Sequence, residues 1–250
     1  MSGNPGEPPS SKERNMRRSP KSERSRLHAF PASDPDGIQR IEAHIAQHIG
    51  APESVLHEIV SDLVHIDIQL VPPTQERDFY TLVTTGMSDL PMQAPAGLED
   101  YRYAELLICL PPNWRIPALY QLDADEADYW PIRWLKFLAR FPHEYDTWLW
   151  ASHALPNGDP PQPFAAGTRL CAALLDIPLL FSEEFLTLEV RPGKIVHFLS
   201  FIPIYREELD LKQHAGYDAL IDLLNKAGVT ELLDPKRKNV ALRSPFGSIH

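Results

Sequence analysis

The sequence predicts an α+β fold in which a mostly antiparallel β-sheet is flanked by helices. Segments with helical spacing and segments with strand-like alternation follow in the coarse order helix, three strands, helix, three strands, helix. The connections between successive strands are short, which favours antiparallel neighbours. Hydrophobic residues make up 43% of the 250 residues, so the chain can bury a sizeable core without disulfide bonds.

Residues 1–34 are predicted to be a disordered basic tail that precedes a domain at 35–250. This stretch is rich in Ser, Pro, Arg and Gly and has few aliphatic residues, so burial could not offset the entropy of ordering it. Residues 1–26 hold seven Lys or Arg against three Glu, a net +4, which leaves -14 for the remainder of a chain whose total is -10. Such an acidic body suits a basic protein partner better than nucleic acid.

The first helix is predicted to begin at Asp34 and to end at Gly50, because isoleucines recur between them at helical spacing. His44 and His48 lie four residues apart beside this apolar stripe. That spacing suits a metal ion, but the sequence shows no third ligand. We therefore expect both rings to be solvated at the flank of the helix.

Ser61 to Val71 is predicted to be a strand, because apolar residues alternate with polar ones along it. His65 and Asp67 share its polar face, where a carboxylate could orient an imidazole for base catalysis. No nucleophile is evident beside them, so solvation or cross-strand pairing is the preferred interpretation. A hydrolase that uses His65 and Asp67 is kept as an alternative.

Two further strands, Tyr80–Thr85 and Tyr103–Leu110, bracket a polar loop, and a helix is predicted at Tyr129–Phe141. Pro131 suits the first turn of that helix, and Pro142 is expected to stop it.

Thr147–His153 alternates weakly, as an extended segment would, and a loop follows it at Leu155–Pro161. Trp148 and Trp150 would then lie on one side of the segment, either in the core or as aromatic anchors of an interface. The remaining predicted elements are a strand at Thr168–Ile177, a hairpin of Phe185–Val190 with Lys194–Ile204 around a type II turn, and a helix at Tyr217–Ala227.

The sequence contains no nucleotide-binding, zinc-protease or serine-hydrolase motif, so we expect no cofactor, metal site or catalytic residue. Cys109 and Cys171 lie in apolar runs and are predicted to be buried thiols, which fits a reducing cytoplasmic compartment. No apolar run approaches the length of a membrane span.

Five segments, in the same order, resemble the Suppressor of Fused family over residues 38–240. The first is TGMSDLPM at 85–92, and the second is Ala104-Glu105-Leu106 at the start of a strand. The others are the helix at 134–141, residues 153–161, and FLSFIPIYREELDLK at 198–212. The resemblance implies a single domain of this family, with a protein-binding role and no catalytic activity.

Animal members of the family look like two-domain proteins that clamp an extended peptide of a zinc-finger transcription factor, and this chain is similar to their first half. The segment that grips the peptide corresponds to Phe141–Asn157. The resemblance therefore implies a set of partner-binding residues within it: Phe141, Asp146, Trp148, Trp150, His153 and Asn157.

Stand-alone members of this length are typically bacterial, and several resemble immunity proteins. The leading hypothesis is a cytoplasmic protein that sequesters or neutralises a cognate partner, either a basic toxin encoded beside it or an extended peptide segment, by adding a strand to its sheet edge. It would bind neither nucleic acid nor membranes. A scaffold or regulatory subunit is the other non-enzymatic alternative.

Overall fold

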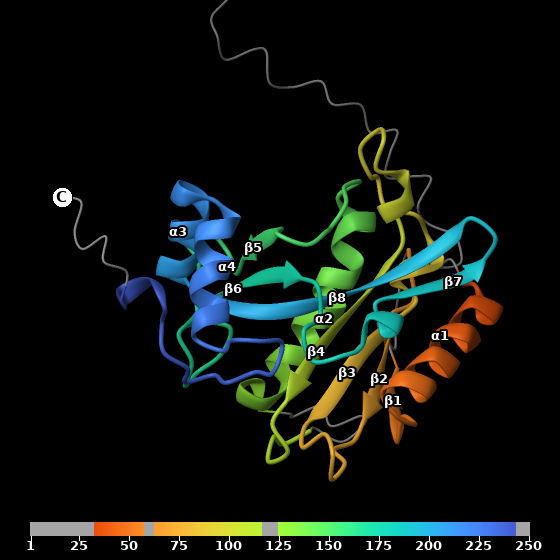
Figure 1. Cartoon of the computed structure of the whole chain (residues 1–250), viewed down its shortest axis with the longest axis horizontal. Helices are drawn as coiled ribbons and strands as arrows, with labels where there is room; N and C mark the ends of the chain where they lie inside the picture. Colours follow the sequence, from red (N-terminus) through yellow and green to blue (C-terminus); the bar gives the residue numbers. More distant parts are fainter. Residues whose placement is uncertain (1–32, 58–62, 117–124, 244–250) are drawn as a thin grey trace, which may run out of the picture. The chain divides into compact units, whose positions relative to one another are not determined.

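The computed structural model describes residues 33–57, 63–116 and 125–243, in which eight strands form one sheet (Figure 1). The strands follow the order β1-β2-β3-β4-β8-β6-β5, and β7 pairs with β8 off this path. Of the seven pairings in the described ranges, six are antiparallel and one, β4 with β8, is parallel. The predicted α+β class with a mostly antiparallel sheet is confirmed.

The strands are β1 (Ser54–Leu56), β2 (Asp67–Val71), β3 (Tyr80–Thr85), β4 (Ala104–Leu110), β5 (Ala154–Pro156), β6 (Leu170–Asp176), β7 (Thr187–Arg191) and β8 (Lys194–Tyr205). The helices are α1 (Pro35–His48), α2 (Glu126–Glu144), α3 (Arg206–Ala215) and α4 (Tyr217–Lys226). None of the helices within the described ranges has both the length and the apolar content needed to cross a lipid bilayer.

Helices cover both faces of the sheet, which explains why its central strands are apolar without interruption. Along β4, Leu106 and Ile108 pack in the core beneath α2, whereas Leu107 and Cys109 pack in the core beneath α1. A third apolar cluster lies where α3 and α4 cover β6 and β8. Figure 1 shows α1 and the α3–α4 pair over opposite ends of the sheet.

The family-like segment at 85–92 is held by a carboxylate buried inside the fold. Glu105, at the start of β4, is 0% exposed and accepts hydrogen bonds from the backbone N–H groups of Gly86 and Ser88, at 3.1 and 3.0 Å. The hydroxyls of Thr84 and Ser88 donate to it at 2.6 and 2.7 Å. Gly86 has a φ of 105°, and a Cβ there would lie 1.9 Å from the carbonyl oxygen of His65. These residues therefore shape the turn between β3 and β4.

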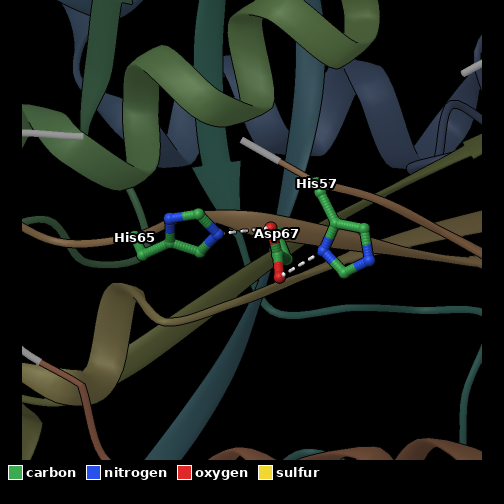
Figure 2. A group of neighbouring side chains, drawn as sticks. All are labelled: His57, His65 and Asp67. Atoms are coloured by element: carbon green, nitrogen blue, oxygen red, sulfur yellow. Dashed lines mark hydrogen bonds and ion pairs between the residues drawn. The ribbon is translucent and has the colours of Figure 1, made fainter. Parts of the chain in front are cut away.

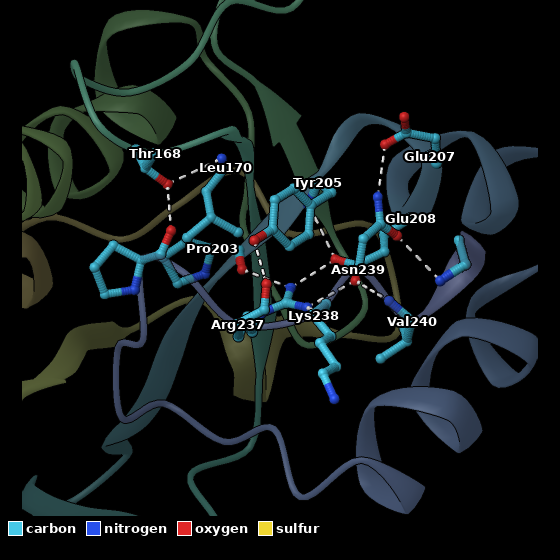
Figure 3. Close-up of polar contacts among 12 residues, drawn as sticks. Thr168, Leu170, Pro203, Tyr205, Glu207, Glu208, Arg237, Lys238, Asn239 and Val240 are labelled. Atoms are coloured by element: carbon cyan, nitrogen blue, oxygen red, sulfur yellow. Dashed lines mark hydrogen bonds and ion pairs between the residues drawn. The ribbon is translucent and has the colours of Figure 1, made fainter. Parts of the chain in front are cut away.

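A buried ion pair holds the segment after α4 against the body of the fold. Arg237 is paired with Glu208 of α3 through two bonds of 2.7 and 2.6 Å, and it also donates to the carbonyl oxygen of Pro203 at 3.0 Å (Figure 3). Glu208 is 0% exposed and accepts from the backbone N–H groups of Tyr205 and Val240, each at 2.9 Å. The polar face of α3 is thus satisfied by the chain that returns across it.

Most predicted elements are found close to their expected positions. The first helix ends at His48, and the β7–β8 hairpin turns through Pro192 and Gly193, whose φ of 79° fits the predicted turn. The strand predicted at Ser61–Val71 begins only at Asp67, but Val64, Ile66, Ile68 and Leu70 are all buried as the alternation required. Residues 58–62 lie outside the described ranges, as does the predicted disordered tail apart from Ser33 and Asp34.

The limits predicted for the second helix are wrong at both ends. Helix α2 begins at Glu126, so Pro131 lies in its second turn, and the helix continues past Pro142 to Glu144. A proline cannot donate a backbone hydrogen bond, but its φ is compatible with a helix. A proline near the end of a helix, such as Pro142, therefore disturbs few of the helix hydrogen bonds. The backbone N–H of Tyr145 still bonds to the carbonyl oxygen of Phe141.

His44 is not solvated, which corrects the expectation for the first helix. Its ring packs against both Phe185 and Phe198, with ring centroids 5.5 and 5.3 Å away, and its Nε2 is 3.0 Å from the carbonyl oxygen of Phe185. The loop before β7 folds over α1 and buries the ring, which no local pattern shows.

Cys109 and Cys171 are buried free thiols, as predicted, and burial raises the pKa of both.

Candidate protein-binding surface

Strand β5 forms one edge of the sheet and pairs with β6 alone in the strand order. The carbonyl oxygen of His153 accepts from the N–H of Leu175, and the N–H of Asn157 donates to the carbonyl oxygen of Cys171. In an antiparallel pair the bonding residues alternate, so the backbone groups of Ala154 and Pro156 point away from β6. Proline has no N–H to donate, and an edge position is where a sheet tolerates it.

The chain before β5 is a loop rather than the extended segment predicted at Thr147–His153. Asp146 and Ser152 take positive φ values of 50° and 73°, which turn the chain at both ends of the loop. Leu149 is 2% exposed and anchors the middle of the loop in the core beneath α2. The backbone N–H of Leu149 also points to the sulfur of Met92, at 3.4 Å.

Trp148 and Trp150 are both half-buried, so each combines the two roles left open by the sequence. Both pack against the core beneath α2, and each keeps part of its surface exposed. The ring of Trp150 lies 4.4 Å from that of Tyr101 and 4.9 Å from that of His197. Tyr101 and His197 were not predicted, because they come from a distant loop and from β8 and share no sequence pattern with the tryptophans.

His153 joins the two tryptophans. Its ring lies edge-on to Trp148 at 5.0 Å, and its Nδ1 accepts from the backbone N–H of Trp150 at 3.2 Å. Burial lowers the pKa of His153, which favours the neutral ring that this acceptor role requires. Trp148, Trp150 and His153 are therefore one connected group directly before the edge strand.

The family model of the Suppressor of fused protein (SUFU) matches residues 62–238, which include the Glu105 turn, the tryptophan loop and the edge strand. This chain belongs to the Suppressor of fused family. A comparison with curated proteins found no match. The resemblance seen in the sequence is thus confirmed over more than half of the chain.

Solved structures of Suppressor of fused proteins have the same fold at low sequence identity. A homolog from Neisseria gonorrhoeae is 15% identical with a TM-score of 0.60, over 82% of this chain and 97% of that one. A chain from a Sufu–Fu complex is 14% identical with a TM-score of 0.58, over 85% and 96%. Drosophila Suppressor of Fused is 13% identical with a TM-score of 0.56, over 86% of this chain and 55% of that one.

The other predicted contact residues of this Suppressor of fused domain are spread around the tryptophan group. Phe141 is half-buried near the end of α2, with its ring 4.7 Å from that of Tyr145, which is 61% exposed. Asp146 is exposed and turns the chain. Asn157 holds the loop after β5, because its side-chain amide donates to the carbonyl oxygens at 162 and 163. Its geometry indicates a structural role, and Tyr145 is an exposed aromatic residue that the sequence reasoning missed.

The pair named for the hydrolase alternative lies elsewhere, near β1 and β2. His65 Nε2 is 3.1 Å from Asp67 Oδ1, and His57 Nδ1 is 2.9 Å from Asp67 Oδ2. Figure 2 shows the carboxylate between the two imidazole rings. His65 and Asp67 contact each other, as the hydrolase alternative requires, and Asp67 also has a cross-strand partner in His57, which the sequence did not reveal. The hydrolase alternative stays a prediction.

Proposed function

We propose that this chain is a non-catalytic protein-binding domain that sequesters a cognate protein in the cytoplasm. The observation that carries the proposal is the juxtaposition of an edge strand with exposed aromatic surface. Strand β5 directs backbone groups away from the sheet, and Trp148 and Trp150 lie in the loop that leads into it. This is the arrangement that binds an extended peptide by strand addition, with aromatic residues supplying affinity beside it.

The backbone groups exposed along β5 determine which hydrogen-bonding groups a partner strand must supply. Ala154 presents one N–H and one carbonyl oxygen outward, and Pro156 presents a carbonyl oxygen only. A partner strand would therefore supply one acceptor and two donors along this edge. The half-buried faces of Trp148 and Trp150 would accept apolar side chains at one end of that strand.

We further propose an immunity-type role, in which the partner is a basic toxin encoded beside this protein in a bacterium. The chain carries a net charge of -10, which would speed its association with a basic partner. A bacterial relative has the same fold over 97% of its length, which supports a stand-alone domain. Another relative was solved as a Sufu–Fu complex, which supports partner binding by this fold.

The edge-strand proposal is tested by Ala154→Pro, which removes the one outward N–H without removing a bond to β6. Ala154→Ser keeps this N–H and is the matched control. We expect Ala154→Pro to weaken partner binding by at least about tenfold in a calorimetric titration, while both variants keep the thermal midpoint of the wild type. Equal affinity of the two folded variants would exclude strand addition at β5.

The identity of the partner is tested by co-expression with the protein encoded next to this one. We expect the wild type to suppress toxicity and to co-purify in a stoichiometric complex, and the double variant Trp148→Ala/Trp150→Ala to fail in both. Toxicity that the wild type leaves unchanged would refute the immunity role. Suppression by the folded double variant would instead show that the partner binds to another surface.

A further inference from the structure

The group formed by His57, His65 and Asp67 is independent of the proposed binding surface, and we infer that it binds a divalent transition-metal ion such as Zn²⁺. The three residues offer two imidazole nitrogens and a carboxylate oxygen, all within 4.8 Å of one another. Within the described ranges it is the one group of three or more His, Cys, Asp or Glu residues with this geometry.

The fold brings the three side chains together through the register of β1 and β2. Leu56 pairs with Ile68 in this antiparallel ladder, so the next position on each side places His57 opposite Asp67. His65 lies two residues before Asp67, just ahead of β2, and its Nε2 reaches the same carboxylate. A cross-strand pair and an alternate neighbour thus form a triangle of ligands, and both rings are turned toward the carboxylate (Figure 2).

The distances fit ligands that share one ion. Two donors bound to a tetrahedral Zn²⁺ at about 2.0 to 2.1 Å lie roughly 3.3 Å apart. His57 Nδ1 lies 2.9 Å from Asp67 Oδ2, His65 Nε2 lies 3.1 Å from Asp67 Oδ1, and the three ligand atoms are all within 4.8 Å of one another, so small shifts of the side chains would bring them to this spacing. Imidazole and carboxylate together suit Zn²⁺ and its neighbours in the first transition series better than Mg²⁺ or Ca²⁺.

The site is open on one side, which leaves a position for water. The side chains of His57, His65 and Asp67 are 57%, 39% and 20% exposed. Lys136 of α2 donates to the carbonyl oxygen of His57 at 3.1 Å and interacts electrostatically with Asp67. Its charge opposes a second cation, so we expect weaker binding than at a closed structural zinc site, which holds four protein ligands.

The test uses the full chain without a histidine tag, stripped with EDTA and titrated with ZnCl₂ in a calorimeter, and with CoCl₂ in a visible spectrometer. We expect one ion per chain, with a Co²⁺ absorption band from ligand-field transitions. His57→Ala and Asp67→Asn should each weaken binding at least about tenfold. His214→Ala removes an exposed histidine on α3 and should leave binding unchanged.

Thermal unfolding supplies a second readout. Because an ion that binds only the folded state raises its stability, Zn²⁺ should raise the melting temperature of the wild type and of His214→Ala. It should not raise that of His57→Ala or Asp67→Asn, whose metal-free melting curves show whether they are folded. The inference is overturned if these folded variants bind Zn²⁺ as the wild type does. It is equally overturned if the wild type binds no more than His57→Ala, in which case Asp67 only accepts hydrogen bonds from the two rings.

Discussion

Glu105 offers the sharpest test of how the turn between β3 and β4 is held. Its carboxyl group is fully buried, and burial raises its pKa from 4.5 to about 7 although four donors point at it. The folded protein therefore holds this proton more tightly than the unfolded chain does. The stabilisation is complete below pH 4.5 and is lost as the pH rises through 7. Between these two pH values the protein loses about 3 kcal/mol of its free energy of unfolding through this group.

The perturbation is Glu105→Gln, which removes the titration and keeps the shape of the side chain. The glutamine oxygen can accept the three bonds that reach Oε1 from Gly86 and Ser88, and its amide can donate to the hydroxyl of Thr84. We expect the free energy of unfolding of the wild type, relative to this variant, to rise by about 3 kcal/mol between pH 8 and pH 4.

The assay is urea unfolding followed by tryptophan fluorescence at pH steps from 8 to 4. The difference between two proteins is needed because other groups titrate in the same range. Asp89, whose pKa burial raises to about 6, acts in the same direction as Glu105, whereas burial lowers the pKa of His44, His143 and His197, which acts in the opposite direction. Glu189→Gln, at an exposed position on β7, controls for loss of a charge. A difference that stays flat, or that favours the glutamine variant in acid, would show that the four donors keep the carboxylate ionised and would refute the argument.

Two further predictions concern the other constrained positions. Gly86→Ala should lower the free energy of unfolding by more than about 4 kcal/mol, because its Cβ would overlap the carbonyl oxygen of His65. Gly167→Ala, which has a φ of 87° and open space around it, should cost only about 1 to 2 kcal/mol in the same urea titration; equal losses would contradict the steric argument. Arg237→Met should cost roughly 3 to 5 kcal/mol, because it leaves Glu208 buried without its partner. A loss below about 1 kcal/mol, measured by the same method, would contradict the argument that Glu208 needs Arg237 as its partner.

Local sequence patterns were sufficient to predict most strands of the sheet and two of the helices. The alternation that ends in β2, the apolar runs of β4 and β6, and the Pro-Gly turn between β7 and β8 are signals carried by neighbouring residues. The isoleucine stripe of α1 and the leucines of α4 are likewise visible in the sequence. Each of these elements buries one or both of its faces, so apolar residues recur along it at the spacing of a helix or a strand.

The elements that were missed have no such period. Helix α3 buries only Glu208 and Leu209, and its stability depends on the segment that returns through Arg237. Strands β1 and β5 have three residues each, too few to show alternation. The tryptophan loop departs from the extended form because Asp146 and Ser152 take positive φ, which non-glycine residues rarely do. His57 meets His65 and Asp67 only through the register of two strands.

Glu105 belongs to a different strand of the sheet from the edge strand proposed to bind a partner. Gly86 and Glu105 hold the β3–β4 turn, whereas β5 lies at the far edge, beyond β8 and β6. Their variants should therefore fail in different ways. Glu105→Ala leaves the buried N–H groups of Gly86 and Ser88 without an acceptor and should lower the free energy of unfolding by about 2 to 5 kcal/mol. The partner affinity of the molecules that remain folded should change little. Trp148→Ala/Trp150→Ala should lose affinity in molecules that are fully folded. If instead Glu105→Ala reduced affinity at a temperature where the protein is fully folded, the β3–β4 turn itself would belong to the binding surface, and the edge strand would no longer account for partner recognition.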